Sequence, residues 1–98
     1  MRTSNTIDRM RGLLGRKQLT ADEALLITPC SSVHTIGMHY SIDLLYLDDN
    51  WEIKKIVPAL SPYRASWAPG ATMVVETLAG IVADLGLTTG NKIRWEST

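Results

Sequence analysis

The strongest pattern in the chain lies at residues 42–47, where apolar side chains occupy nearly every position. A strand formed by these residues is apolar on both faces, which is typical of a central, buried strand. Asp43 is the one charged residue in this run and stands near its beginning. The pattern therefore predicts a buried central strand that starts beside a carboxylate.

Further apolar runs of strand length precede and follow this one. The turn cluster at residues 48–50 leads into a hairpin partner. Near the C-terminus apolar and charged residues alternate, which predicts a last strand. In one run Gly37 weakens the strand or marks a bulge. The strands predicted in this way are residues 24–28, 33–38, 42–47, 52–57, 72–78 and 92–96.

Two short helices and one long loop complete the predicted elements. Residues 7–14 have apolar positions at helical spacing with Thr6 as a cap, and residues 79–85 predict a second helix that ends near Gly86. Residues 58–71 contain three prolines and are predicted to form an irregular loop. A loop of this length in a small domain is often functional.

The way these elements are connected predicts the fold class. Because turns rather than crossover helices join most strands, we expect a mostly β (α+β) fold in a single domain spanning residues 1–98. The strands are expected to form a compact, predominantly antiparallel sheet or small barrel with one or two short helices. The composition, 45% hydrophobic and 20% charged residues, is that of a folded soluble protein.

The balance of charge argues against several partners and locations. Ten lysines and arginines match ten aspartates and glutamates, so we expect no nucleic acid partner. No apolar stretch approaches the ~18 residues of a membrane span, and residues 1–6 lack the apolar core of a signal peptide. We therefore expect a cytoplasmic protein without a membrane span. The single cysteine excludes an internal disulfide, which fits a reducing compartment.

The cysteine and both histidines lie close together in sequence and raise the question of a metal site. Cys30, His34, His39 and Asp43 are residue types that bind zinc, but their spacing is not that of a zinc finger. The odd separation of the two histidines points them to opposite faces of an extended strand, unless a bulge at Gly37 brings them together. We expect no metal site and no cofactor, and keep metal binding through the cysteine and the histidines as an alternative.

Two carboxylates, Asp43 and Glu76, are each set among apolar residues. A buried carboxylate is paired, hydrogen-bonded or protonated. Arg11, Arg16, Arg64 or backbone amides could be the partners, which would give the carboxylates a structural role. Alternatively, the carboxylates form the wall of a pocket that recognises a polar ligand.

The proline-containing loop brings Tyr63, Arg64 and Trp67 together in sequence. Aromatic rings beside an arginine suit stacking on a ligand or a partner. They suit equally well a loop that packs its own rings onto the domain. The sequence leaves both interpretations open.

A set of short motifs runs in a fixed order along nearly the whole chain. The motifs are residues 11–16, 25–27, Val33-His34-Thr35-Ile36-Gly37-Met38, residues 42–48, Pro62-Tyr63-Arg64, residues 74–80, 85–87 and 90–91. This ordered set resembles the bacterial and archaeal family called domain of unknown function 192. The resemblance implies a compact, mostly β domain with one or two small helices and brings no established activity. Other branches of that family carry an aromatic residue at the position of His34, so a zinc site here would be a subfamily trait, and Asn91 stands where an aspartate is common.

Taken together, these observations favour a ligand- or partner-binding module with a polar pocket, for an unknown small molecule or protein. Charged residues in apolar surroundings and the long aromatic loop support this interpretation. The predicted ligand-binding residues are Arg11, Met38, Asp43, Arg64 and Glu76.

The main alternative is a hydrolytic enzyme in which Asp43 or Glu76 acts as a general base together with a histidine. Such an enzyme requires two of these groups close to one substrate atom. A structural or assembly partner with no pocket is the remaining alternative. The sequence leaves open whether the protein is an enzyme.

Overall fold

The computed structural model describes residues 2–4, 19–20 and 23–95. The helix predicted at residues 7–14 lies outside the described residues. Within them, the chain forms seven strands and one short helix in the order β1 (Arg2–Ser4), β2 (Glu23–Ile27), β3 (Ser32–His34), β4 (Ile42–Leu47), β5 (Ile53–Leu60), β6 (Ala65–Trp67), β7 (Met73–Leu78) and α2 (Ile81–Asp84).

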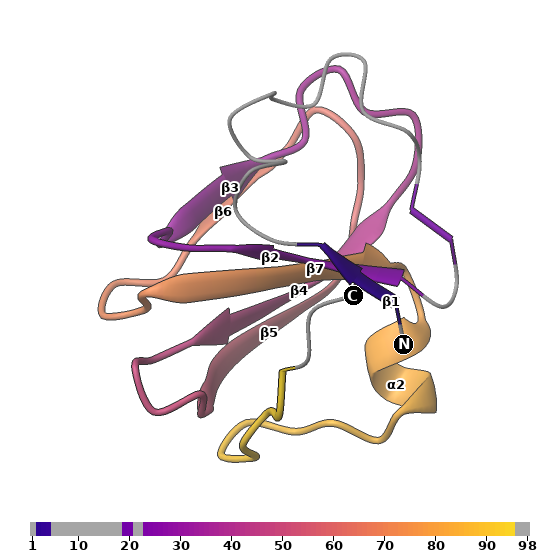
Figure 1. The fold of residues 1–98 in the computed structure, drawn as a ribbon. Coiled ribbons are helices and arrows are strands. Elements are labelled where there is room, and N and C mark those ends of the chain that lie inside the picture. Colours follow the sequence, from indigo (N-terminus) through magenta and orange to yellow (C-terminus); the bar gives the residue numbers. More distant parts are fainter. Residues whose placement is uncertain (1, 5–18, 21–22, 96–98) are drawn as a thin grey trace.

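The strands form one larger and one smaller sheet (Figure 1). The larger sheet has five strands in the order β1-β2-β7-β4-β5, and the smaller consists of β3 and β6. All pairs are antiparallel except β1 with β2. The predicted mostly β, antiparallel fold is therefore confirmed, in the form of open sheets and not a closed barrel.

Strand β4 is the centre of the larger sheet, as its apolar pattern predicts. It pairs with β7 on one side and β5 on the other, and every residue of Ile42–Leu47 is buried. Burial on both faces follows from the two layers that cover the sheet. The predicted strands at β2 and β7 and the short helix at α2 are also present, each within a residue or two of its expected ends.

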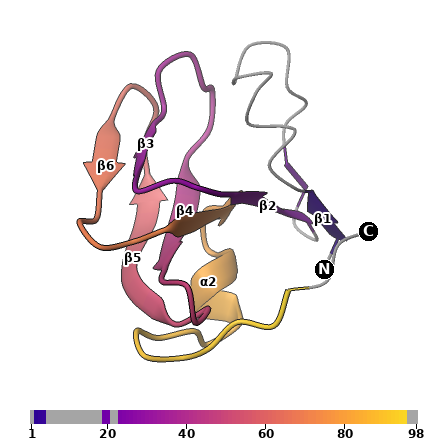
Figure 2. The same cartoon turned by 60° about the vertical axis from the view of Figure 1, so that its left-hand side comes forward.

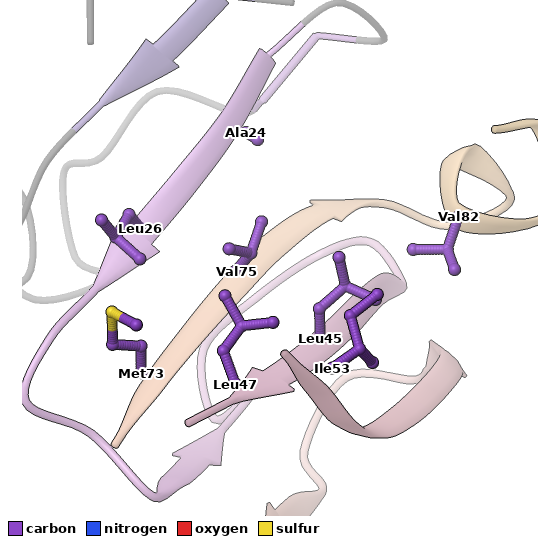
Figure 3. Packing of buried hydrophobic residues seen from close by; sticks show 8 residues of the cluster. All are labelled: Ala24, Leu26, Leu45, Leu47, Ile53, Met73, Val75 and Val82. Atoms are coloured by element: carbon purple, nitrogen blue, oxygen red, sulfur yellow. The ribbon is translucent and has the colours of Figure 1, made fainter. Parts of the chain in front are cut away.

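Different elements cover the two faces of the larger sheet. The β3–β6 pair lies over the face that we call the upper face, while α2 and residues 85–95 lie under the lower face (Figures 1 and 2). Buried side chains of β2, β4, β5, β7 and α2 meet under the lower face (Figure 3). They are Ala24, Leu26, Leu45, Leu47, Ile53, Met73, Val75 and Val82, with Trp51, Ile56, Leu87, Ile93 and Trp95 packed against them.

The prediction of an irregular loop at residues 58–71 is wrong at two places. Strand β5 continues through Pro58 to Leu60, and Ala65–Trp67 form β6 within the same stretch. Pro58 is tolerated because β5 is an edge strand and because the pairing shifts at this point, so that two residues of β5 stand opposite Asp43. Edge position and register are long-range properties that the local sequence does not contain.

Two further predicted strands differ from the structure. The strand expected at residues 33–38 ends at His34, because a turn follows in which Gly37 has a φ of 86°. The last strand expected at residues 92–96 is not formed in its described part, residues 92–95, where Lys92 makes only an isolated bridge to Glu52. The segment instead runs beneath the larger sheet and contributes its apolar side chains to the lower cluster.

Candidate functional site

Asp43 ties three parts of the fold together through backbone amides. Its side chain is 2% exposed. Oδ1 accepts a hydrogen bond from the amide of Ala59 at 2.8 Å, and Oδ2 accepts from Gly80 at 2.9 Å and Val82 at 3.1 Å. The carboxylate thus fixes the bulge of β5, where Ala59 has a φ of 50°, to the start of α2. A carboxylate held by amides is one of the structural roles that the sequence left open.

Glu76 is equally buried, at 1% exposed, but it lies on the other face of the sheet. In the antiparallel pairing of β4 with β7, Asp43 stands opposite Thr77 and Leu44 stands opposite Glu76. Opposite residues share a face and successive residues alternate, so Asp43 faces down and Glu76 faces up. The structure therefore does not bring the two carboxylates to one substrate atom.

Polar groups gather around the Tyr46 hydroxyl on the upper face. Burial is the main cause that raises the pKa of Tyr46, and the Ser66 hydroxyl opposes this rise. The charges of Cys30 and Glu76 also act to raise the pKa. No atom in the described part of the chain makes a well-formed hydrogen bond to the Tyr46 hydroxyl. This group is buried and satisfied only incompletely.

Arg64 and Met38 belong to the layer above the sheet, and Thr35 connects them. Met38 belongs to a buried apolar cluster on the upper face that also contains Ile42 and Tyr46. Arg64 is exposed. The Thr35 hydroxyl donates to the carbonyl of Ser61 at 2.7 Å and accepts from the amide of Arg64 at 2.8 Å. Arg11, the fifth predicted ligand-binding residue, lies outside the described residues. The structure thus places the described four on two faces of the sheet.

The aromatic rings of the loop are directed outward. Tyr63 is 65% and Trp67 is 64% exposed. Trp67 stands opposite Ser32 in the β3–β6 pair. Ser66, the residue before Trp67 in β6, is buried. Of the two interpretations that the sequence left open, the loop packing its own rings onto the domain is not the one the structure adopts. We use the name aromatic face for the two exposed rings of Tyr63 and Trp67.

The cysteine and the histidines do not form a ligand cluster. Cys30 donates its thiol to the carbonyl of Ser32 at 2.9 Å, and both His34 and His39 are exposed. No group of three metal-binding side chains able to hold an ion occurs among the described residues.

A cavity of about 440 Å³ opens under the lower face of the sheet. It lies between β2, β4 and β7 above and α2 and residues 85–95 below. Its wall is mainly apolar, and Figure 3 shows four of these side chains, Ala24, Leu45, Val75 and Val82. The remaining lining residues are Thr77, Leu85, Leu87, Lys92, Ile93, Arg94 and Trp95.

None of the four described ligand-binding candidates is among the residues that line this cavity, but Asp43 supports it. Val82 lines the cavity, and its amide donates to the Asp43 carboxylate. Thr77, the cross-strand partner of Asp43, also lines it. Sequence reasoning missed the cavity because residues 92–95 were assigned to a strand. The sequence feature that belongs to the cavity is the segment in which Ile93 and Trp95 alternate with the cationic Lys92 and Arg94.

Trp95 contributes an unusual polar group to the cavity region. Its ring stacks on Trp51, with centroids 6.4 Å apart and an interplanar angle of 22°. Its indole Nε1 is buried and has no hydrogen-bond acceptor in the described part of the chain. Buried donors are nearly always satisfied, so this N–H is a donor available to an acceptor.

These features define a class of protein: a mostly antiparallel β domain with a small sheet over its larger sheet and a cavity under it. Its family follows from its sequence: the chain belongs to the DUF192 family, described as "Uncharacterized ACR", whose profile matches residues 3–95. This confirms the family indicated by the motifs. None of the curated protein sequences matches the chain.

Two solved structures share the fold. A protein of unknown function from Novosphingobium aromaticivorans is similar with a TM-score of 0.80 at 21% identity, over 95% of this chain and 74% of the other. A protein from Sinorhizobium meliloti, provisionally named a transcription regulator, is similar with a TM-score of 0.79 at 20% identity. That match covers 92% of this chain and 78% of the other. In the part of the chain that the structure describes, no helix is long and apolar enough to cross a membrane.

Proposed function

We propose that this protein is a binding module whose cavity under the larger sheet holds a small, mainly apolar molecule. The observation that supports this function is the cavity itself. Its volume of about 440 Å³ lies in the range of small-molecule sites, which is roughly 300–1,000 Å³. Its wall combines many apolar side chains with a few polar ones, as such sites commonly do.

In this proposal Asp43 is a positioning residue and not a ligand contact. Its carboxylate holds the amides of Gly80 and Val82, and Val82 forms part of the cavity wall. A firmly held wall reduces the free energy needed to order the site when a ligand binds. Met38, Arg64 and Glu76 stay predicted ligand contacts at the upper face, and Arg11 stays a predicted ligand contact outside the described residues.

Titration calorimetry with decanol as an apolar probe tests the proposed cavity. We expect binding by the unaltered protein and its loss in Ala24→Leu, because Ala24 is 1% exposed and the larger side chain fills the space. Ile93 is half-buried and lines the lower side of the cavity, so Ile93→Trp should also narrow it. This second variant replaces Ala24→Leu in the test if Ala24→Leu does not fold. Ala83→Leu, on the exposed side of α2, is the matched control and should bind decanol as before. Absence of decanol binding by the unaltered protein would contradict the proposal.

The aromatic face supports a second candidate function, the binding of a protein partner. Tyr63 and Trp67 are more than half exposed, and exposed aromatic side chains are enriched at the centres of interfaces. A partner identified by affinity capture should bind the purified protein and lose at least ~10-fold in affinity with Trp67→Ala. Leu85→Ala, at another exposed apolar residue, is the control. Equal affinities of both variants would remove this candidate.

Two further expectations concern the location of the protein in the cell and the class of its partners. We place the protein in the cytoplasm, since a chain with a single cysteine fits a reducing compartment. The equal numbers of acidic and basic residues support partners other than nucleic acid.

A further inference from the structure

The charges around the cavity narrow the class of ligand it suits. We infer that the cavity selects amphiphilic acids, which are molecules with an apolar body and a single free carboxylate. This inference rests on the proposed function and names its ligand class. The apolar body would occupy the space under β2, β4 and β7, and the carboxylate would lie toward residues 92–95.

Among the described residues that line the cavity, two are cationic and none is acidic. These two are Lys92 and Arg94, and the other described lining residues are apolar except for Thr77. Lys92 is exposed and forms no ion pair with any residue that the structure describes. Arg94 has an interaction of its own within the chain, so the inference depends first on Lys92.

Two acidic residues close to this site do not cancel these charges. Glu52 stands opposite Lys92 in the isolated bridge, but its carboxylate pairs with Lys54 at 2.9 Å. Asp43 faces the same side of the sheet as Thr77, but both of its carboxylate oxygens accept hydrogen bonds from backbone amides. Amides that point at a carboxylate compensate much of its charge locally. The cavity is therefore cationic at the end formed by residues 92–95.

The unsatisfied indole N–H of Trp95 gives independent support. It is a buried donor without an acceptor among the described residues, and it belongs to the same segment as the two cations. A carboxylate has two oxygens and about four acceptor positions, so it can accept from an ammonium group and from an indole N–H together. A neutral alcohol has fewer acceptor positions and no charge, and an alkylammonium ion has none.

Three ligands of equal chain length test the inference by titration calorimetry: decanoate, decanol and decylammonium, each below its micelle concentration. We expect decanoate to bind about 10-fold or more tightly than decanol, since a charge-assisted contact is worth at least about that factor. Decylammonium should bind less tightly than either. Lys92→Gln should reduce the preference for decanoate over decanol to about threefold or less. Lys55→Gln, at an exposed cation whose ammonium group lies over the Tyr46 ring on the upper face, should leave the preference unchanged.

The outcomes separate the inference from the function on which it rests. If decanol and decanoate bind equally and Ala24→Leu abolishes both, the cavity binds apolar molecules and the inference of acid selectivity is overturned. If decanoate is preferred but Lys92→Gln leaves the preference intact, the carboxylate is recognised elsewhere and the inference is also overturned. If none of the three ligands binds, the proposed function fails, and the inference fails with it.

Discussion

Asp43 and Glu76 are on neighbouring strands but differ by one position in the register of the pairing, so they face opposite sides of the larger sheet. Each is almost completely buried, yet their surroundings differ. Asp43 is surrounded by backbone amides at the junction of β5 and α2, whereas Glu76 lies between Leu25 and Leu44 on the upper face. The two carboxylates consequently have separate roles, which can be tested separately.

Replacing Asp43 should destabilise the fold strongly. Asp43→Ala removes the acceptor of three amides and leaves one buried and two part-buried donors unsatisfied, so the free energy of unfolding should fall by roughly 3–5 kcal/mol. Asp43→Asn should cost less, because one carbonyl oxygen remains as an acceptor. Urea unfolding provides the measurement, with Asp84→Ala at an exposed residue of α2 as the control. Similar losses in Asp84→Ala and Asp43→Ala would contradict the role given to Asp43.

Glu76→Gln should disturb the protein more than Glu52→Gln. Glu76 is 1% exposed, whereas Glu52 is half-buried and pairs with the exposed Lys54 at 2.9 Å. Loss of a charged group from a buried, interacting position costs roughly 1–3 kcal/mol, while a surface pair contributes about 1 kcal/mol or less. Thermal melting of both variants at pH 7 measures the difference. Equal melting temperatures would show that Glu76 does not depend on its charge.

Tyr46→Phe should leave stability at neutral pH nearly unchanged and improve it in alkali. The hydroxyl is buried without a well-formed hydrogen bond, so its removal should change the free energy of unfolding by less than about 1 kcal/mol. Burial raises the pKa of Tyr46 above its ordinary value of 10.0, so the unfolded chain loses this proton at a lower pH than the folded protein. Stability should therefore fall as the pH rises above about 10, and less so in the variant. Denaturant midpoints between pH 8 and roughly 11.5 test this, and parallel curves for the two proteins would refute it.

Asp48 should give the β4–β5 hairpin a stability that is lost in acid. Its Oδ1 accepts from the amides of Asn50 at 2.8 Å and Glu52 at 3.1 Å, and Oδ2 pairs with Lys54 at 3.3 Å. The amide of Glu52 is the main cause that lowers the pKa of Asp48 below its usual value of 3.8. A lowered folded-state pKa contributes stability above the unfolded value, and this contribution disappears as the pH falls through the folded value.

The comparison of Asp48→Asn with the unaltered protein isolates this contribution. Melting temperatures between pH 6 and roughly 2.5 should fall less steeply for Asp48→Asn, since the amide oxygen accepts at all pH values. Asp49→Asn, at the neighbouring exposed position, should follow the unaltered protein. An equally steep fall for Asp48→Asn would mean that the hairpin does not depend on this charge.

Local patterns predicted the centre of the fold well and its edges poorly. Strand β4 is apolar at nearly every position, and such a run fits few environments other than the middle of a sheet. Pro58 and Trp95 show the opposite case. Whether a proline sits in an edge strand, or an alternating segment pairs as a strand, depends on which distant residues lie beside it.

The site was predictable only in part for the same reason. That Asp43 and Glu76 would be buried follows from their apolar neighbours in sequence. That they face opposite sides depends on the register of β4 against β7, and the cavity depends on where residues 92–95 cross the lower face. The cationic residues at 92 and 94 were visible as a pattern, but only the fold gives them a shared space.

The irregular end of β5 also limits how this protein can associate. An exposed edge strand invites extended chains to add to the sheet and so promotes aggregation. Here the outer strand carries the charges of Lys54 and Lys55, a missing N–H at Pro58 and the bulge held by Asp43, three features that disfavour the addition of another strand. By holding the bulge, Asp43 therefore makes this edge of the sheet a poorer template for pairing with a second chain.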